Sequence, residues 1–127
     1  MSEGEGIDIQ APYDPGNIFA RILRGEIPGD RVHEDDDFIA FRDIAPQAPH
    51  HIVLIPRGEP PTSPAGIDAS WEPLGGRMLR VAAAIARAQG LERSGYRLVL
   101  NCGPDAGQTV PHLHLHILGG APLGPLA

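Results

Sequence analysis

Three histidines, His112, His114 and His116, alternate with leucines in the run HLHLHILGG, which directly follows GQTVP. Side chains on a β-strand point alternately to its two faces, so a strand over this run places all three imidazoles on one face. Imidazole exchanges protons near neutral pH, acts as a nucleophile and binds metal ions. We therefore expect the function of the protein to depend on this run.

Amide and hydroxyl groups lie just upstream of the histidines, on a glycine-rich turn: Asn101, Gly103, Gly107, Gln108 and Thr109. Backbone N–H groups on such a turn can converge on an anion, which suggests a phosphate beside the imidazoles. One imidazole can attack phosphorus while an acceptor holds its other nitrogen, and flanking imidazoles and amides stabilise the developing charge. His114 alone has a histidine on both sides, so it is the candidate nucleophile.

Two other interpretations of the histidine row remain open. Histidines at i and i+2 can share a zinc or iron ion, but three ligands on one straight strand span roughly 13 Å. Further metal ligands could come from His33, His50 and His51, but no cluster of His, Asp and Glu at a recognisable ligand spacing accompanies them. The three histidines can also be hydrogen-bonded structural residues. We expect neither a metal nor a cofactor at the site.

Two helices are predicted to flank the strands. The first begins with Asp14 as N-cap and ends at Gly25, with apolar residues at helical spacing between them. The second is about 20 residues long. It begins after Asp68 or Ser70, ends at Gly90 and carries an apolar stripe. Its many alanines let a second backbone approach closely, which favours a homodimer.

Strands are predicted over residues 31–34, 38–43, 50–56, 96–101 and 112–118. Consecutive strands joined by tight turns favour an antiparallel sheet that carries its helices on one face. The predicted fold class is therefore α+β, with about five strands, one long helix and one short N-terminal helix. The predicted domain organisation is a flexible segment over 1–13, one domain over 14–120 and a tail over 121–127.

Bulk composition excludes several classes of function. The 127-residue chain has a net charge of −6, which argues against binding polynucleotides through a general basic surface. A single cysteine excludes an internal disulfide. No apolar run approaches the ~20 residues of a membrane span, and no signal peptide is visible, so we expect a cytoplasmic protein without a membrane partner.

The run from His112 to Leu118 resembles the signature of the histidine triad superfamily. The segments NIFARILRGEIPGDRVHEDDDFIAFRDIAPQAPHHIVLIPR and GYRLVLNCGPDAGQTVPHLHLHILGG are similar to its histidine triad nucleotide-binding branch, over about residues 17–120. The resemblance implies a compact α+β domain that dimerises through its long helix and neighbouring strand, so that one sheet continues across two subunits.

The resemblance also implies an activity and the residues that perform it. The activity is the hydrolysis of purine nucleoside 5′-phosphoramidates, and of aminoacyl-adenylates, through a nucleotidyl-His114 intermediate. His112 and His116 flank the nucleophile, and His51 supports them. Asp43 accepts the ribose hydroxyls. The apolar wall around the base consists of Ile18, Phe19, Phe41 and Ile44. The loop that holds the phosphate and the leaving group contributes Asn101, Gly107, Gln108 and Thr109.

Two other functions remain open beside this one. The same histidines can hydrolyse a dinucleoside polyphosphate at a P–O–P bond, or the protein can be a nucleotide-binding scaffold without catalysis. The tail over residues 121–127 lacks the aromatic residue that some relatives contribute, which leaves the leaving-group preference open.

Overall fold

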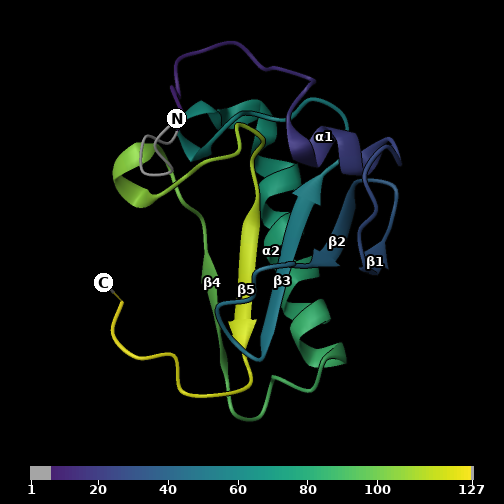
Figure 1. Ribbon diagram of the computed structural model, residues 1–127, viewed down its shortest axis with the longest axis vertical. Coiled ribbons are helices and arrows are strands. Elements are labelled where there is room, and N and C mark those ends of the chain that lie inside the picture. The colour runs from purple at the N-terminus through teal and green to yellow at the C-terminus, as the bar shows by residue number, and fades with distance from the viewer. Residues whose placement is uncertain (1–6, 127) are drawn as a thin grey trace.

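The computed structural model describes residues 7–126 and forms a single sheet with a helix on each side (Figure 1). In chain order its elements are α1 (Ile18–Leu23), β1 (Arg31–Glu34), β2 (Phe38–Arg42), β3 (His50–Pro56), the 3₁₀ turns η1 (Pro64–Gly66) and η2 (Ala69–Trp71), α2 (Glu72–Ala88), β4 (Tyr96–Val99), η3 (Pro104–Ala106) and β5 (Leu115–Gly119).

All neighbouring strands in the sheet are antiparallel, in the order β1-β2-β3-β5-β4. The predicted α+β class with a five-stranded antiparallel sheet, one long helix and one short helix is confirmed. The last strand, β5, lies between β3 and β4, so its side chains are supported from both sides. His116 on β5 pairs with Val53 on β3, which places His116 and His51 as diagonal neighbours on one face.

The two helices cover opposite faces of the sheet. Helix α2 packs against Phe38, Ala40, Ile52 and Leu54 of the central strands, whereas α1 packs against the alternate residues Ile39, Phe41, Val53 and Ile55. The prediction that both helices share one face is therefore wrong. The reason is that β2 and β3 are buried at nearly every position, so both of their faces need a cover.

The last strand begins later than predicted, at Leu115 instead of His112. The Leu113 N–H donates to the carbonyl of Pro61 at 2.9 Å, so the backbone here is bonded to a loop and not to the sheet. The side chains still alternate, because Leu113 joins Leu115 in the core under α2 while the histidines point to the other face. The strand assignment is wrong over residues 112–114, but the facing of the side chains is as expected.

Both helices also begin later than predicted. The N-cap of α1 is Asn17, whose Oδ1 accepts the Ala20 N–H at 2.9 Å, while Asp14 accepts the Gly16 N–H in the preceding turn. Asp68 caps η2 through the N–H of Ser70, so α2 starts only at Glu72. Asp14 and Asp68 are thus real hydrogen-bond acceptors that close shorter turns before the helices, whereas Ser70, the alternative cap of the second helix, donates to Asp68.

The chain ends differ in how far the structure describes them. Residues 1–6 of the predicted flexible segment, and Ala127 of the predicted tail, lie outside the described residues. The rest of the N-terminal segment passes over one end of the sheet toward α1 (Figure 1), and its Tyr13 is hydrogen-bonded to His112. In the tail, the Gly124 carbonyl accepts from Arg97 of β4. No helix within residues 7–126 has the length and apolar character needed to span a membrane.

Candidate active site

His112 is locked in place by hydrogen bonds at both ring nitrogens. Its Nε2 lies 2.9 Å from the Pro56 carbonyl oxygen, which only accepts, so Nε2 carries the proton. Its Nδ1 lies 2.8 Å from the Tyr13 hydroxyl, which must therefore donate. The ring is completely buried, and this burial lowers the pKa of His112 to about 4. His112 is thus a neutral ring with a single tautomer.

His114 has one nitrogen held and one nitrogen free. Its Nδ1 donates to the backbone carbonyl of His112 at 2.7 Å, so in the neutral ring Nε2 carries a lone pair. Burial lowers the pKa of His114, which favours the neutral ring that carries this lone pair. Phe19 contacts the ring edge to face, with the centroids 4.8 Å apart. These contacts prepare Nε2 of His114 to act as a nucleophile.

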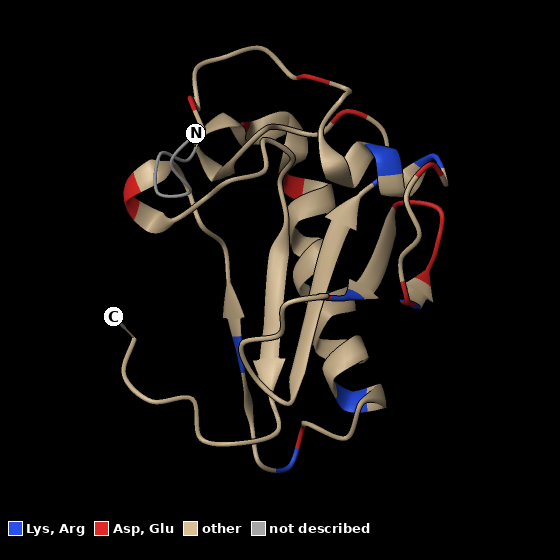
Figure 2. Ribbon diagram, viewed as in Figure 1, with Lys and Arg blue, Asp and Glu red and all other residues tan. Residues whose placement is uncertain are grey.

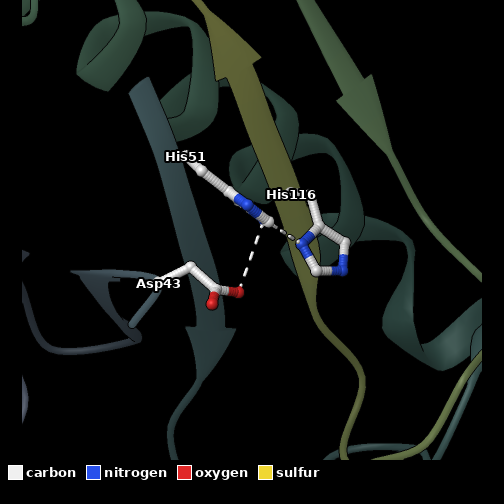
Figure 3. A group of neighbouring side chains, drawn as sticks. All are labelled: Asp43, His51 and His116. Atoms are coloured by element: carbon white, nitrogen blue, oxygen red, sulfur yellow. Dashed lines mark hydrogen bonds and ion pairs between the residues drawn. The ribbon is translucent and has the colours of Figure 1, made fainter. Parts of the chain in front are cut away.

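His51 sets the tautomer of His116 (Figure 3). The backbone N–H of Gln47 donates to Nδ1 of His51 at 3.0 Å, so the proton of neutral His51 is on Nε2. Nε2 then donates to Nδ1 of His116 at 2.8 Å, which leaves the His116 proton on its own Nε2. Burial, and secondly the neighbouring histidines, lower the pKa of His116 to about 4. His116 therefore offers a neutral N–H donor.

His114 and His116 face a common cavity of about 380 Å³, with their ring centroids 5.1 Å apart. The lining combines apolar side chains with charged and polar ones. The lining residues are Ile18, Phe19, Ile22, Ile27, Pro28, Gly29, Phe41, Arg42, Asp43, Ile44, Asn101, Gly107, Thr109, Val110, His114 and His116. A cavity of this size and composition suits a single nucleotide.

The predicted apolar wall is brought together only in part. Ile18, Phe19 and Phe41 line the cavity from α1 and β2, and Phe19 packs edge to face on Phe41. Ile44 also borders the cavity, but its side chain is 97% exposed, so it forms an open rim and not a packed wall.

The predicted phosphate loop separates into lining and supporting residues. Asn101, Gly107 and Thr109 line the cavity. Gln108 is 1% exposed and does not line it. Its Oε1 accepts from the Gly103 N–H, and its Nε2 donates to the carbonyls of Thr62 and Val110. Gln108 therefore shapes the loop from inside, while its neighbours are free to contact a ligand.

The two strands that carry His51 and His116, β3 and β5, contain no Lys, Arg, Asp or Glu (Figure 2). The acidic run of residues 34–37 lies at the β1–β2 connection. Asp43 is the carboxylate beside the imidazoles, with Oδ2 3.5 Å from Nε2 of His51 and Oδ1 accepting the Ala45 N–H. The low polarity around the rings explains why their pKa values fall below the ordinary range.

Asp43, His51 and His116 have ligand atoms within 4.8 Å of one another, the one such group among residues 7–126 (Figure 3). His51 already uses Nδ1 for Gln47 and Nε2 for His116. A metal ion could join this group only by displacing one of these hydrogen bonds. The absence of a resident metal stays a prediction.

Sequence reasoning missed two residues that orient the histidines. Tyr13 is 99 positions from His112, and no spacing rule connects a tyrosine before the first helix to a histidine after the last turn. Gln47 acts through its backbone N–H, so its residue type carries no signal. The apolar lining residue Ile22 lies at helical spacing with Ile18 and Phe19, which indicated it as a packed position, whereas Ile27 follows the end of α1 and had no such signal.

Comparison with known proteins gives one consistent family. The sequence matches the HIT domain family over residues 24–123. The purine nucleoside phosphoramidase of Escherichia coli (strain K12) is 50% identical over 109 residues, which is 86% of this chain and 91% of that protein. The protein named adenylylsulfatase HINT1 of Arabidopsis thaliana is 41% identical over 122 residues, 94% of this chain and 81% of that one. The crystal structure of a HIT family hydrolase from Legionella pneumophila Philadelphia 1 is 41% identical, with a TM-score of 0.79 over 84% of this chain and 98% of that chain.

The buried neutral histidines predict a specific acid sensitivity of folding. The pKa of His112 is about 4 in the folded protein and near 6.5 in the unfolded chain, so between these values the unfolded state binds more protons. The contribution of His112 to the free energy of unfolding is then constant above about pH 6.5 and falls by about 3 kcal/mol as the pH drops toward 4. Urea unfolding at a series of pH values measures this slope.

A His112→Gln variant isolates the contribution of the buried ring. It lowers the free energy of unfolding at every pH, but the slope between pH 6.5 and pH 4 becomes shallower because one titrating group is gone. An unchanged slope in the variant would show that His112 is not held neutral in the fold.

Proposed function

This chain belongs to the HIT domain family of nucleotide hydrolases, and on that premise we propose that it is a nucleoside phosphoramidase that acts through a covalent nucleotidyl-His114 intermediate. One observation carries the proposal. His114 donates Nδ1–H to the His112 carbonyl at 2.7 Å, which leaves its Nε2 lone pair at a cavity of nucleotide size. The name of the Escherichia coli relative supports the P–N bond as the bond that is cleaved.

In the first step Nε2 of His114 attacks phosphorus and the P–N bond to the amine breaks. His116 presents its Nε2–H in the same cavity and can hydrogen-bond to the leaving nitrogen. The proton that this nitrogen takes up comes from solvent water, so the amine departs neutral and His116 keeps its only proton. In the second step water attacks the nucleotidyl group and gives its proton to the solvent. The bond between phosphorus and Nε2 of His114 breaks, so the nucleoside monophosphate is released and His114 is neutral again. The side chains of Asn101 and Thr109, which line the cavity, stabilise the charge on the phosphoryl oxygens.

The rest of the cavity recognises the nucleoside. Ile18, Phe19 and Phe41 offer an apolar surface for a purine base. Asp43 lies at the same cavity with its side chain 25% exposed, so its carboxylate can accept the two ribose hydroxyls. His51 and His112 do not contact the substrate in this proposal; they hold the tautomers of the rings that do.

The pocket beside α2 supports a homodimer. Ile67, Leu79 and Leu100 are 39%, 52% and 42% exposed, and they border an apolar hollow of about 200 Å³. Leu79 projects from α2, the helix whose alanine-rich face already favours close approach of a second helix. We assign this apolar patch to a second copy of the chain. The continuation of the sheet across the two subunits belongs to the same proposal.

The catalytic proposal predicts that His114→Ala loses turnover of an adenosine 5′-phosphoramidate by roughly 10³-fold or more, because no other lone pair replaces Nε2. Amine release is the readout, and the wild-type protein should show a nucleotidyl adduct on His114 by mass spectrometry after rapid acid quench. His33→Asn is the matched control, since His33 lies on β1 and is bonded to Asp35, away from the cavity.

Two further results distinguish the alternatives. Full activity of His114→Ala would contradict the covalent mechanism, and loss of wild-type activity on adding a chelator would restore the metal interpretation. Assaying an adenylyl sulfate and a dinucleoside polyphosphate on the same sample tests the other bond types. The proposal predicts that the phosphoramidate is the best substrate of the three.

Asp43 is predicted to select ribonucleotides. Loss of a hydrogen bond to a charged group costs about 1.5–3 kcal/mol, so a nucleoside monophosphate should bind at least about tenfold more tightly than its 2′,3′-dideoxy counterpart. Asp43→Asn should narrow this ratio, because the amide forms weaker hydrogen bonds with the hydroxyls. Calorimetric titration of both ligands gives the ratio, and equal affinities in the wild type would show that Asp43 does not contact the sugar.

The homodimer proposal predicts a sedimenting mass of about twice 13.5 kDa at micromolar concentration. Leu79→Glu places a charge in the apolar patch and should produce monomers. Arg93→Glu introduces the same side chain at an exposed position in the α2–β4 loop and should leave the dimer intact. A wild-type monomer at high micromolar concentration would refute the proposal.

A further inference from the structure

The Tyr13 hydroxyl reaches a triad histidine from outside the sheet. Tyr13 belongs to the segment before α1, and its hydroxyl lies 2.8 Å from Nδ1 of His112. The Pro56 carbonyl fixes the proton of His112 on Nε2, so Nδ1 has only a lone pair to offer and Tyr13 is the donor. Burial raises the pKa of Tyr13, which keeps the phenol protonated over the whole range in which histidines titrate.

We propose that Tyr13 is a positioning residue of the active site, which holds the nucleophile His114 through His112. The connection consists of two hydrogen bonds that share one residue. Tyr13 donates to the ring of His112, and the backbone carbonyl of His112 accepts Nδ1–H of His114 at 2.7 Å. A shift of His112 therefore moves the acceptor that directs Nε2 of His114 toward the substrate. The part of this inference that turnover measures rests on the proposed function.

Tyr13 acts without contacting the substrate. The substrate cavity is lined by His114 and His116, whereas Tyr13 lines a separate hollow of about 330 Å³ on the other side of α1, together with Arg24 and Arg57. His112, which joins the two, is completely buried and lines neither. Removing the hydroxyl should therefore lower kcat and leave KM nearly unchanged.

The hydroxyl also holds His112 in its neutral form. A donor to Nδ1 stabilises only the neutral ring, so loss of this donor raises the pKa of His112 toward its ordinary value. The charged and titratable groups around the pair are Glu59 of the β3–η1 connection, Arg24 at the end of α1, Asp14 and His114. None of them supplies a second donor to Nδ1 of His112, since Tyr13 is its hydrogen-bond partner among the described residues.

Tyr13→Phe tests the proposal because it removes one oxygen and keeps the ring that packs beside His112. The chain has one other tyrosine, Tyr96 on β4, which packs against the core cluster under α2 and has no contact with His112, so Tyr96→Phe is the matched control. For Tyr13→Phe we expect kcat to fall roughly tenfold or more with KM within about twofold of wild type, because the nucleophile is misplaced and not the substrate. The acid limb of kcat/KM should move to higher pH.

An ¹⁵N NMR titration of the imidazoles supplies a readout that does not require turnover. In the wild type and in Tyr96→Phe, His112 should stay in its Nε2–H tautomer down to about pH 4, whereas in Tyr13→Phe it should titrate at a higher pH. If the wild type releases no amine, the proposed function fails and this titration still decides the role of Tyr13.

Two results would overturn the inference. The first is a Tyr13→Phe protein with wild-type kcat and an unchanged His112 titration. The second is a variant that is less stable in urea but keeps both the wild-type acid limb and the wild-type His112 titration, because the hydroxyl would then serve the fold alone. A folded variant, verified by circular dichroism, with a raised His112 pKa and a selective loss of kcat supports it.

Discussion

A neutral imidazole has one N–H and one lone pair, and a buried ring must find a partner for each. This constraint governs the candidate active site. Tyr13 and the Pro56 carbonyl satisfy both nitrogens of His112, and Gln47 and His116 satisfy both nitrogens of His51. The two rings that line the cavity, His114 and His116, are each satisfied at Nδ1 alone. One is left with a lone pair and the other with a proton, which are the two groups that a displacement at phosphorus needs.

The fold supplies the rigid frame for these hydrogen bonds. Strand β5 lies between β3 and β4, and the residues that precede it are tied to a loop by the Pro61 carbonyl. Apolar side chains bury both faces of β2 and β3, so the imidazoles next to them lie in a medium that disfavours their charged forms. Gln108 braces the neighbouring turn from inside. Stability and reactivity therefore depend on the same burial.

The sequence indicated the site well because its strongest signals are local. Alternation over residues 112–118 placed the three imidazoles on one face, although the strand itself begins only at Leu115, because a loop carbonyl and not a neighbouring strand holds the earlier backbone. The features that the sequence did not predict depend on long-range packing. No local pattern encodes which segments meet in space. The placement of α1 and α2 on opposite faces, the exposure of Ile44 and the hydrogen bond from Tyr13 to His112 all depend on such contacts.

The central claim is that the hydrogen-bond network leaves a lone pair on Nε2 of His114 beside an N–H on Nε2 of His116. The ¹⁵N and ¹H chemical shifts of the imidazole nitrogens in the wild-type protein at pH 7 report which nitrogen of each ring carries the proton. The account predicts protonated Nδ1 and bare Nε2 for His114, and the reverse for His116. A His114 ring protonated at Nε2, or protonated at both nitrogens at this pH, would contradict it.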